Sequence, residues 1–164
     1  MLSINLQEFD YKHIIVCEAI KNSIILYNNF YKLLYSNEFV TFNGIFILFN
    51  FNYNYIIKDK IFFDISKNID VIDKLNIIEY NILNTVNVKK EKQLKLKDFL
   101  KNGIIKFSNC DYDEIDEKFI KLKKINDDAN IENFILKLSG IWENKDYIGI
   151  TFKIINIKNT IEIQ

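Results

Sequence analysis

The sequence contains no proline and no arginine, and all 22 of its basic residues are lysine. Without arginine the chain has no planar guanidinium group to hold a phosphate, a carboxylate or a guanine base through two parallel hydrogen bonds. Phosphate contacts must therefore come from lysine ammonium groups or from backbone N–H groups. Without proline, turns depend on Asn, Asp, Gly and Ser.

Cysteine and histidine are also scarce, since the chain has only Cys17, Cys110 and His13. These three cannot supply the four Cys and His ligands of a structural zinc site. We interpret the cysteines as reduced, buried thiols. No basic segment followed by an apolar run opens the chain, and the apolar runs are too short to cross a bilayer. These features predict an intracellular protein of the cytoplasm or nucleus, not secreted and not in a membrane.

Catalytic motifs are missing too. His13 and Cys17 lie four residues apart and would form a Cys–His pair on a helix, but their apolar neighbours favour a packing role. There is no P-loop, no GxSxG and no GxGxxG. The acidic clusters at 111–117 and 127–128 lack EF-hand spacing. The sequence therefore predicts a protein that is not an enzyme and has no metal and no cofactor.

The composition that remains is apolar and balanced in charge. Hydrophobic residues make up 49% of 164 residues, which is enough for one domain (residues 1–164) with a core. The 22 basic and 22 acidic residues cancel, which argues against tight non-specific DNA binding. Charges alternate in blocks, with six Lys against two acids in 89–101 and five acids against one Lys in 111–118. We interpret 85–130 as a basic and acidic loop region.

Aromatic and β-branched residues predict strands. They concentrate in the first part of the chain, and Asn43-Gly44 is either a hairpin turn or a bulge within one bent strand. A closing hairpin surrounds the turn ENKD at 143–146. The expected strands lie near 23–35, 38–52, 60–65, 103–107, 131–142 and 147–158.

The segment 68–84 has the period of a helix. Its apolar residues recur every three to four positions, with Asn68 or Asp70 as the N-terminal cap. The expected buried face consists of Ile69, Ile72, Leu75, Ile78 (or Glu79) and Ile82. The order of strands, helix and strands predicts an α+β, mostly β fold: a small OB-like barrel, or a curved antiparallel sheet with one packed helix at about 69–83.

The closing hairpin, SGIWENKDYIGITFKI, is the strongest candidate for a binding surface. Strand alternation divides the last strand into an apolar face and a mixed face. The apolar face has Ile148, Ile150, Phe152 and Ile154, and the mixed face has Tyr147, Gly149, Thr151 and Lys153. On the preceding strand Phe134, Leu136, Leu138, Gly140 and Trp142 share one face, and Ile135, Lys137, Ser139 and Ile141 share the other. Trp142 and Tyr147 either stabilise the hairpin or offer a stacking platform for bases.

Two segments resemble a known protein family. YKLLYSNEFVTFNGIFILF (31–49) and FILKLSGIWENKDYIGITFKI (134–154) are similar to blocks in small proteins of large DNA viruses, particularly of insects. Those blocks read YS-x-E-x-x-T-x-NGI and SGIWE…YG-T-K. The resemblance implies an OB-fold single-stranded DNA-binding protein used in replication, with Trp142, Tyr147 and Lys153 in the closing block. Ile148, between Tyr147 and Gly149, departs from the pattern.

Two functional hypotheses follow. The first is an oligomeric single-stranded DNA-binding module. In it aromatic rings stack on bases (Trp142, Tyr147, Phe46, Tyr53 and Tyr55), and lysines contact phosphates (Lys137, Lys153, Lys89, Lys90 and the other lysines of 89–101). The second is a protein–protein or homo-oligomerisation module that uses the aromatics of 42–63 and a sheet edge. Lysines beside exposed aromatics would favour the first hypothesis, and scattered lysines with an apolar patch the second.

Overall fold

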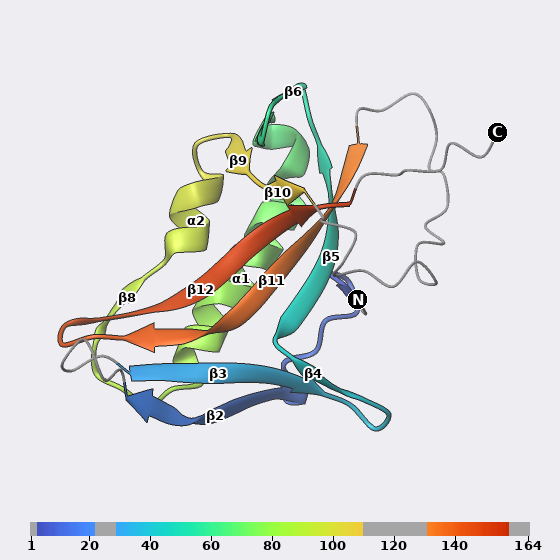
Figure 1. Cartoon of the computed structure of the whole chain (residues 1–164). Coiled ribbons are helices and arrows are strands. Elements are labelled where there is room, and N and C mark those ends of the chain that lie inside the picture. Colours follow the sequence, from blue (N-terminus) through green and yellow to red (C-terminus); the bar gives the residue numbers. More distant parts are fainter. Residues whose placement is uncertain (1–2, 22–28, 110–130, 158–164) are drawn as a thin grey trace.

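The structure is a computed structural model that describes residues 3–21, 29–109 and 131–157. A curved, open, mixed β-sheet forms most of it, and the helix α1 (Ile69–Asn84) covers one face, with α2 (Lys95–Leu100) beside it (Figure 1). The expected class, α+β and mostly β, is confirmed. We call the side facing α1 the core face and the opposite side the outer face.

The long strand β11 (Ile131–Glu143) lies at the centre of the sheet. It pairs antiparallel with β12 (Tyr147–Asn156) on one side, and on the other side first with β5 (Ile45–Asn52) and then with β3 (Asn29–Ser36). β3 also pairs with β2 (Ile14–Lys21) and β4 (Thr41–Asn43). Three short strands add parallel pairs: β1 (Ile4–Asn5) on β5, and β8 (Glu91–Gln93) and β10 (Ser108–Asn109) on β12.

The predicted barrel is wrong, because the sheet does not close. Within the described ranges, no strand joins β12 to β2, since β12 is bordered by β8 and β10 while β2 pairs with β3. The sheet is also mixed and not purely antiparallel, because the three short border strands run parallel to their neighbours. A second, three-stranded sheet consists of β6 (Tyr55–Ile57), β7 (Lys60–Phe62) and β9 (Ile104–Lys106).

Gly44 separates β4 from β5 and has a φ of 105°. Because β4 pairs with β3 and β5 pairs with β11, the Asn43-Gly44 step is a bend within one extended segment and not a hairpin turn. A side chain at this φ would be strained, which explains the glycine.

Two local expectations were wrong. Within the described residues, the strand expected near 23–35 begins only at Asn29, as β3, and the preceding strand β2 was not expected; residues 22–28 lie outside the described part. A helical Cys–His pair, which the apolar neighbours argued against, does not form, because His13 ends the short 3-10 helix Tyr11–His13 and Cys17 lies in β2. The expected loop region 85–130 contains β8, α2, β9 and β10 up to residue 109, and its remainder, with the acidic block 111–118, is not described.

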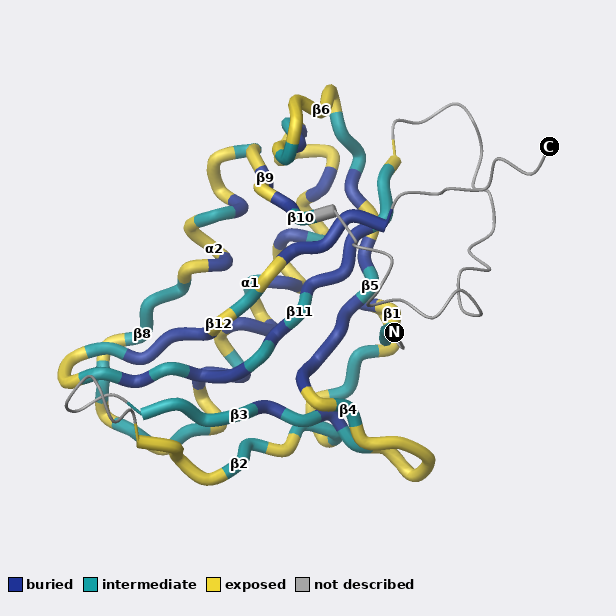
Figure 2. Tube along the Cα trace, viewed as in Figure 1, coloured by how far each residue is buried: buried dark blue, intermediate teal, exposed yellow. Residues whose placement is uncertain are grey.

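The core lies between α1 and the core face of the sheet. Ile72, Leu75, Ile78 and Ile82 of α1 are buried as expected, but Ile69 is exposed. They pack against buried residues of β5, β11 and β12, which form continuous buried stretches, while much of β2 is exposed (Figure 2). The 3.6-residue period thus identified the helix and most of its buried face.

Asn68 does not cap α1 as predicted. Its side chain instead accepts a 2.8 Å hydrogen bond from the Asn52 backbone N–H and donates to the backbone oxygens of Asn52 (2.9 Å) and Asp64 (2.8 Å). The buried amide therefore connects the start of the helix to the end of β5.

Glu79 connects the two helices. Its fully buried carboxylate accepts 2.9 Å hydrogen bonds from the backbone N–H groups of Leu96 and Lys97, at the start of α2. No side chain at the N-cap position of α2, Leu94, provides this cap. Burial raises the pKa of Glu79 above its ordinary value of 4.5, and the two backbone hydrogen bonds only partly oppose the rise.

We expect Glu79 to make stability fall as the pH rises from about 4.5. A raised pKa in the folded state means that the folded protein binds the proton more tightly than the unfolded chain does. The resulting contribution to the free energy of unfolding is complete below pH 4.5 and is lost as the pH rises through the pKa of the folded state. Urea unfolding of the wild type and of Glu79→Gln between pH 4 and pH 7 measures it. The stability of the wild type relative to the variant should decline over this range, and a constant or rising difference would contradict the assignment.

Candidate nucleic-acid interface

A β-bulge at Ser139 decides which residues of β11 reach the outer face. The pairing of β11 with β12 shifts register between Leu138 and Gly140. The extra residue reverses the alternation, so that Ile141 joins the core, while Gly140 and Trp142 turn to the outer face. The prediction that Gly140 and Trp142 share a face with Leu138 was therefore wrong.

The outer face is organised in cross-strand rows. Directly paired residues of neighbouring strands point to the same side of a sheet. The rows are Phe46, Lys137 and Lys153; Lys32, Gly140 and Thr151; and Phe30, Trp142 and Gly149. The structure thus brings together five of the expected site residues: Trp142, Tyr147, Lys137, Lys153 and Phe46. Tyr147 is placed on this face by alternation from Gly149.

Trp142 packs on the neighbouring strand. A Cβ placed on Gly149 would lie 2.4 Å from the ring atom Cζ2, so the ring occupies the space that a side chain would need. The indole Nε1–H donates a 3.1 Å hydrogen bond to the Ile150 carbonyl oxygen, and the Lys95 ammonium lies 4.4 Å from the ring centroid. The ring therefore stabilises the hairpin, as one of the two interpretations expected, and it remains partly exposed.

Phe30 repeats this arrangement on the next pair of strands. Its Cζ atom lies 2.2 Å from the position that a Cβ on Gly140 would occupy. Phe30 and Trp142 are directly paired, and each ring lies above a glycine, Phe30 above Gly140 and Trp142 above Gly149. Phe30 and Lys32 were not among the predicted site residues, because their place beside Trp142 follows from the Ser139 bulge.

Four lysines lie on or over the outer face: Lys32, Lys95, Lys137 and Lys153. Within the described ranges none of the four forms an ion pair. Lys137 lies 5.5 Å from the ring centroid of Phe46. By register the nearest acids are Glu18, in the part of β2 opposite Lys32, and Glu91, opposite Tyr147 at the border of the sheet. The face has a local excess of positive charge although the chain is neutral.

The other expected site residues are not part of this face. Tyr53 packs against the core, and Tyr55 stacks on Phe62 in the small sheet at 4.6 Å between ring centroids. Lys89 is exposed in the segment before β8, and Lys90 is ion-paired. Phe46 lies on the outer face but is only 9% exposed, so its ring is not open for stacking.

Glu143 explains the position of Lys90. The buried carboxylate forms a 2.5 Å ion pair with Lys90 and accepts hydrogen bonds from the Tyr31 hydroxyl (2.6 Å) and the Asn29 amide (3.0 Å). Burial alone would raise the pKa of Glu143, but these three partners outweigh it and lower the pKa. The hydrogen bond to Glu143, with burial, raises the pKa of Tyr31 to about 12. This cluster connects the hairpin to β3 and to the segment before β8.

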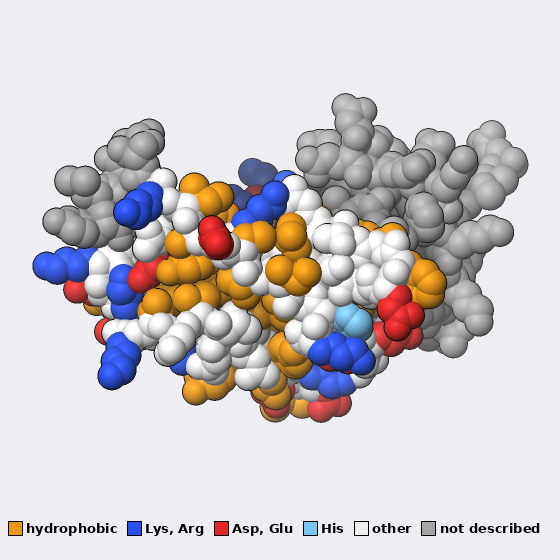
Figure 3. Space-filling view, turned by 90° about the horizontal axis from the view of Figure 1, so that it is seen from below, with side chains coloured by type: hydrophobic (Ala, Val, Ile, Leu, Met, Phe, Trp, Pro, Cys, Tyr) orange, Lys and Arg blue, Asp and Glu red, His pale blue; other side chains and the backbone are white. Residues whose placement is uncertain are grey.

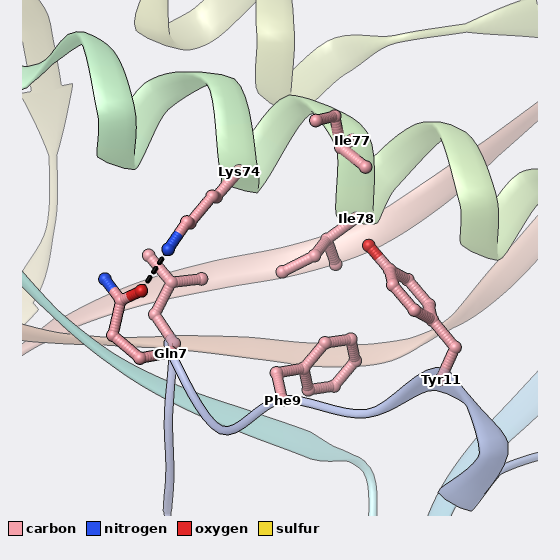
Figure 4. Close-up of a pocket in the computed structure, with 7 residues that line it drawn as sticks. Gln7, Phe9, Tyr11, Lys74, Ile77 and Ile78 are labelled. Atoms are coloured by element: carbon pink, nitrogen blue, oxygen red, sulfur yellow. Dashed lines mark hydrogen bonds between the residues drawn. The ribbon is translucent and has the colours of Figure 1, made fainter.

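A cavity of about 210 Å³ lies elsewhere, between α1 and the N-terminal segment (Figure 4). Its wall is mainly apolar, and a hydrogen bond from Lys74 to Gln7 crosses it. Leu6, Gln7, Phe9, Tyr11, Lys74, Ile77 and Ile78 line the cavity. None of the expected site residues contributes to it.

Comparison of the chain with protein-family models, with curated proteins and with solved structures returned no match. No helix in the described ranges combines the length and the apolar character needed to cross a bilayer. Residues 3–21, 29–109 and 131–157 contain no cluster of three or more His, Cys, Asp or Glu side chains arranged to hold a metal ion.

Gly149→Ala should displace Trp142. The added Cβ would overlap the ring, and overpacking of this kind costs about 1–3 kcal/mol of stability. We expect a lower free energy of unfolding and a shift of tryptophan emission to longer wavelength. Thr151→Val, two residues further along the same face, is the matched control and should leave the emission unchanged. Unchanged emission in Gly149→Ala would contradict the described packing.

Proposed function

We propose that the chain is a non-enzymatic module that binds single-stranded nucleic acid across the outer face of its sheet. One observation supports the proposal above all: the outer face has Phe30 and Trp142 at directly paired positions, together with four lysines that form no ion pair within the described ranges. Proteins that bind single strands combine aromatic rings, on which bases stack, with cations that follow the phosphates.

The rows of the outer face offer a repeating surface. Residues two positions apart on one strand are roughly 7 Å apart and point to the same side. From the ring pair of Phe30 and Trp142, the next row contributes Lys32 and the row after that contributes Lys137 and Lys153. A strand of nucleic acid that stacks a base at the ring pair would therefore have ammonium groups along its path.

Lys95 competes with a base for the face of Trp142. The contact of an exposed ammonium with a ring is worth about 0.5–1 kcal/mol, and stacking of a base is worth about 1–3 kcal/mol. A base therefore displaces Lys95, whose ammonium stays close enough to meet a phosphate.

The lack of arginine shapes the specificity and the strength of binding. Lysine contacts a phosphate as a point charge on a flexible stem and lacks the rigid fork of arginine, so we expect the module to tolerate many sequences. Four phosphate contacts on a single strand correspond to a slope of about −3 in a plot of log K against log salt concentration. A neutral chain adds little long-range attraction, so binding is modest and is lost at high salt.

The resemblance to viral replication proteins supports the same proposal. The two similar segments, 31–49 and 134–154, include most of β3, β5, β11 and β12, the strands that form the outer face. The proposal therefore includes an accessory role in DNA replication, in the cytoplasm or nucleus of a host cell. A second candidate, homo-oligomerisation, is favoured by a different feature, the exposed apolar strand β2.

The single tryptophan allows a direct test. Titration with an oligonucleotide of about 20 thymidines should quench the emission of Trp142, because a base stacks on the ring. Anisotropy of a labelled strand measures the affinity, which we expect to be micromolar at low salt. Trp142→Ala should weaken binding about 5- to 150-fold, the equivalent of 1–3 kcal/mol of stacking.

Charge reversal locates the surface. Lys137→Glu and Lys153→Glu should each weaken binding and reduce the salt slope by about 0.7. Lys67→Glu, outside the outer face, changes the net charge equally and should have little effect. The proposal fails if no strand binds at low salt, or if Lys67→Glu reduces affinity as much as Lys153→Glu does.

A further inference from the structure

β2 is a sheet edge that offers apolar side chains. It pairs with β3 on one side, and no other strand of the described ranges pairs with it. Ile15 is 46% exposed and Ile20 is 59% exposed. Figure 3 shows the molecule from below, where β2 lies in Figure 1, and hydrophobic side chains gather across the middle of this side with lysines toward its ends. Edge strands are usually protected by charge, but β2 has only Glu18 and Lys21.

A β-bulge makes β2 symmetrical about its centre. Val16 pairs with Leu33 and Ala19 pairs with Tyr31, so Cys17 and Glu18 together lie opposite Lys32. Residues five positions apart would lie on opposite faces of a regular strand. The extra residue instead puts both Ile15 and Ile20 on the outer face, paired with Leu34 and Phe30.

We propose that β2 pairs antiparallel with β2 of a second copy of this chain, around a two-fold axis between Cys17 and Glu18. This register matches Ile15 of one copy with Ile20 of the other, and Val16 with Ala19. Ile15 and Ile20 both lie on the outer face, and Val16 and Ala19 both lie on the core face. The two side chains of each pair therefore point to the same side of the sheet, as direct pairing requires. A two-fold interface requires a patch that is complementary to itself, and the bulge gives β2 this property.

The pairing provides hydrogen-bond partners for the backbone groups of the open edge and covers its exposed apolar residues. Backbone N–H and C=O groups of the two edges bond to each other, and Ile15 and Ile20 of both copies become covered. Glu18 of each copy lies close to the axis, and the adjacent Lys32 on β3 offsets the repulsion. The two sheets then form one continuous sheet whose outer faces lie on the same side.

The inference is independent of nucleic-acid binding and is tested on the full chain alone. Sedimentation velocity across micromolar concentrations should show a mass twice that of one chain. Ile15→Lys and Ile20→Lys should each give a monomer, because a charge would be buried opposite an isoleucine. Ile57→Lys is the matched control: Ile57 is 54% exposed in β6, and this variant should remain a dimer.

A disulfide cross-link tests the register of the β2–β2 pairing, and it tests the dimer itself if a lysine variant does not fold. With Cys17 and Cys110 replaced by serine, Ile15→Cys combined with Ile20→Cys should form a disulfide-linked dimer on oxidation. Directly opposed residues have Cα atoms about 4.5–5.5 Å apart, within reach of a disulfide. Ile15→Cys alone should not cross-link, because it faces Ile20. Three results would overturn the proposal: a monomeric wild type, a dimer that neither lysine variant disrupts, or equal cross-linking by Ile15→Cys alone. A wild type that stays monomeric and pairs β2 only with a strand of another protein would overturn it as well.

Discussion

The whole sheet depends on one change of partner along β11. Leu138 pairs with Ile45 of β5, and two residues later Gly140 pairs with Lys32 of β3. Two irregularities make the change possible at this point: the extra residue Ser139 and the bend at Gly44, whose hypothetical Cβ would lie 3.2 Å from the Leu138 carbonyl oxygen. Because the bulge also reverses the faces of β11, the same residue that curves the sheet puts Trp142 beside Phe30.

Two buried carboxylates, Glu79 and Glu143, connect elements of the fold, and their surroundings shift their pKa values in opposite directions. Glu79 has only backbone N–H partners, burial dominates, and its pKa rises. Glu143 has a cation, a hydroxyl and an amide as partners, and its pKa falls. The first connects α1 to α2 and the second connects the hairpin to β3, so the two ends of the fold respond to acid in opposite directions.

The sequence revealed the elements whose periodicity is regular. The helix α1 and the two faces of β12 were predicted because apolar residues recur at 3.6 and at 2 positions. The bulges at Ser139 and at Cys17–Glu18 were missed, because an inserted residue of ordinary type leaves no pattern of its own. The helix α2 was missed because it has a single full turn of apolar residues and is capped by Glu79, a residue 17 positions away from Leu96. Of the candidate site, Trp142, Lys137 and Lys153 were found in the sequence, but Phe30 and Lys32 join them only through pairing across more than a hundred residues.

The position of β11 in the chain has a consequence for biosynthesis. The central strand comes after β2 to β9 in the sequence, so a ribosome releases all of its neighbours except β12 before it. Until β11 emerges, β3 and β5 lack the partner that separates and orders them, and their apolar residues have no closed core. Proteins with many contacts between distant parts of the chain fold slowly and form intermediates that expose apolar surface and tend to aggregate. The nascent chain therefore exposes the unpaired edges of β3 and β5 until the hairpin of β11 and β12 is synthesised.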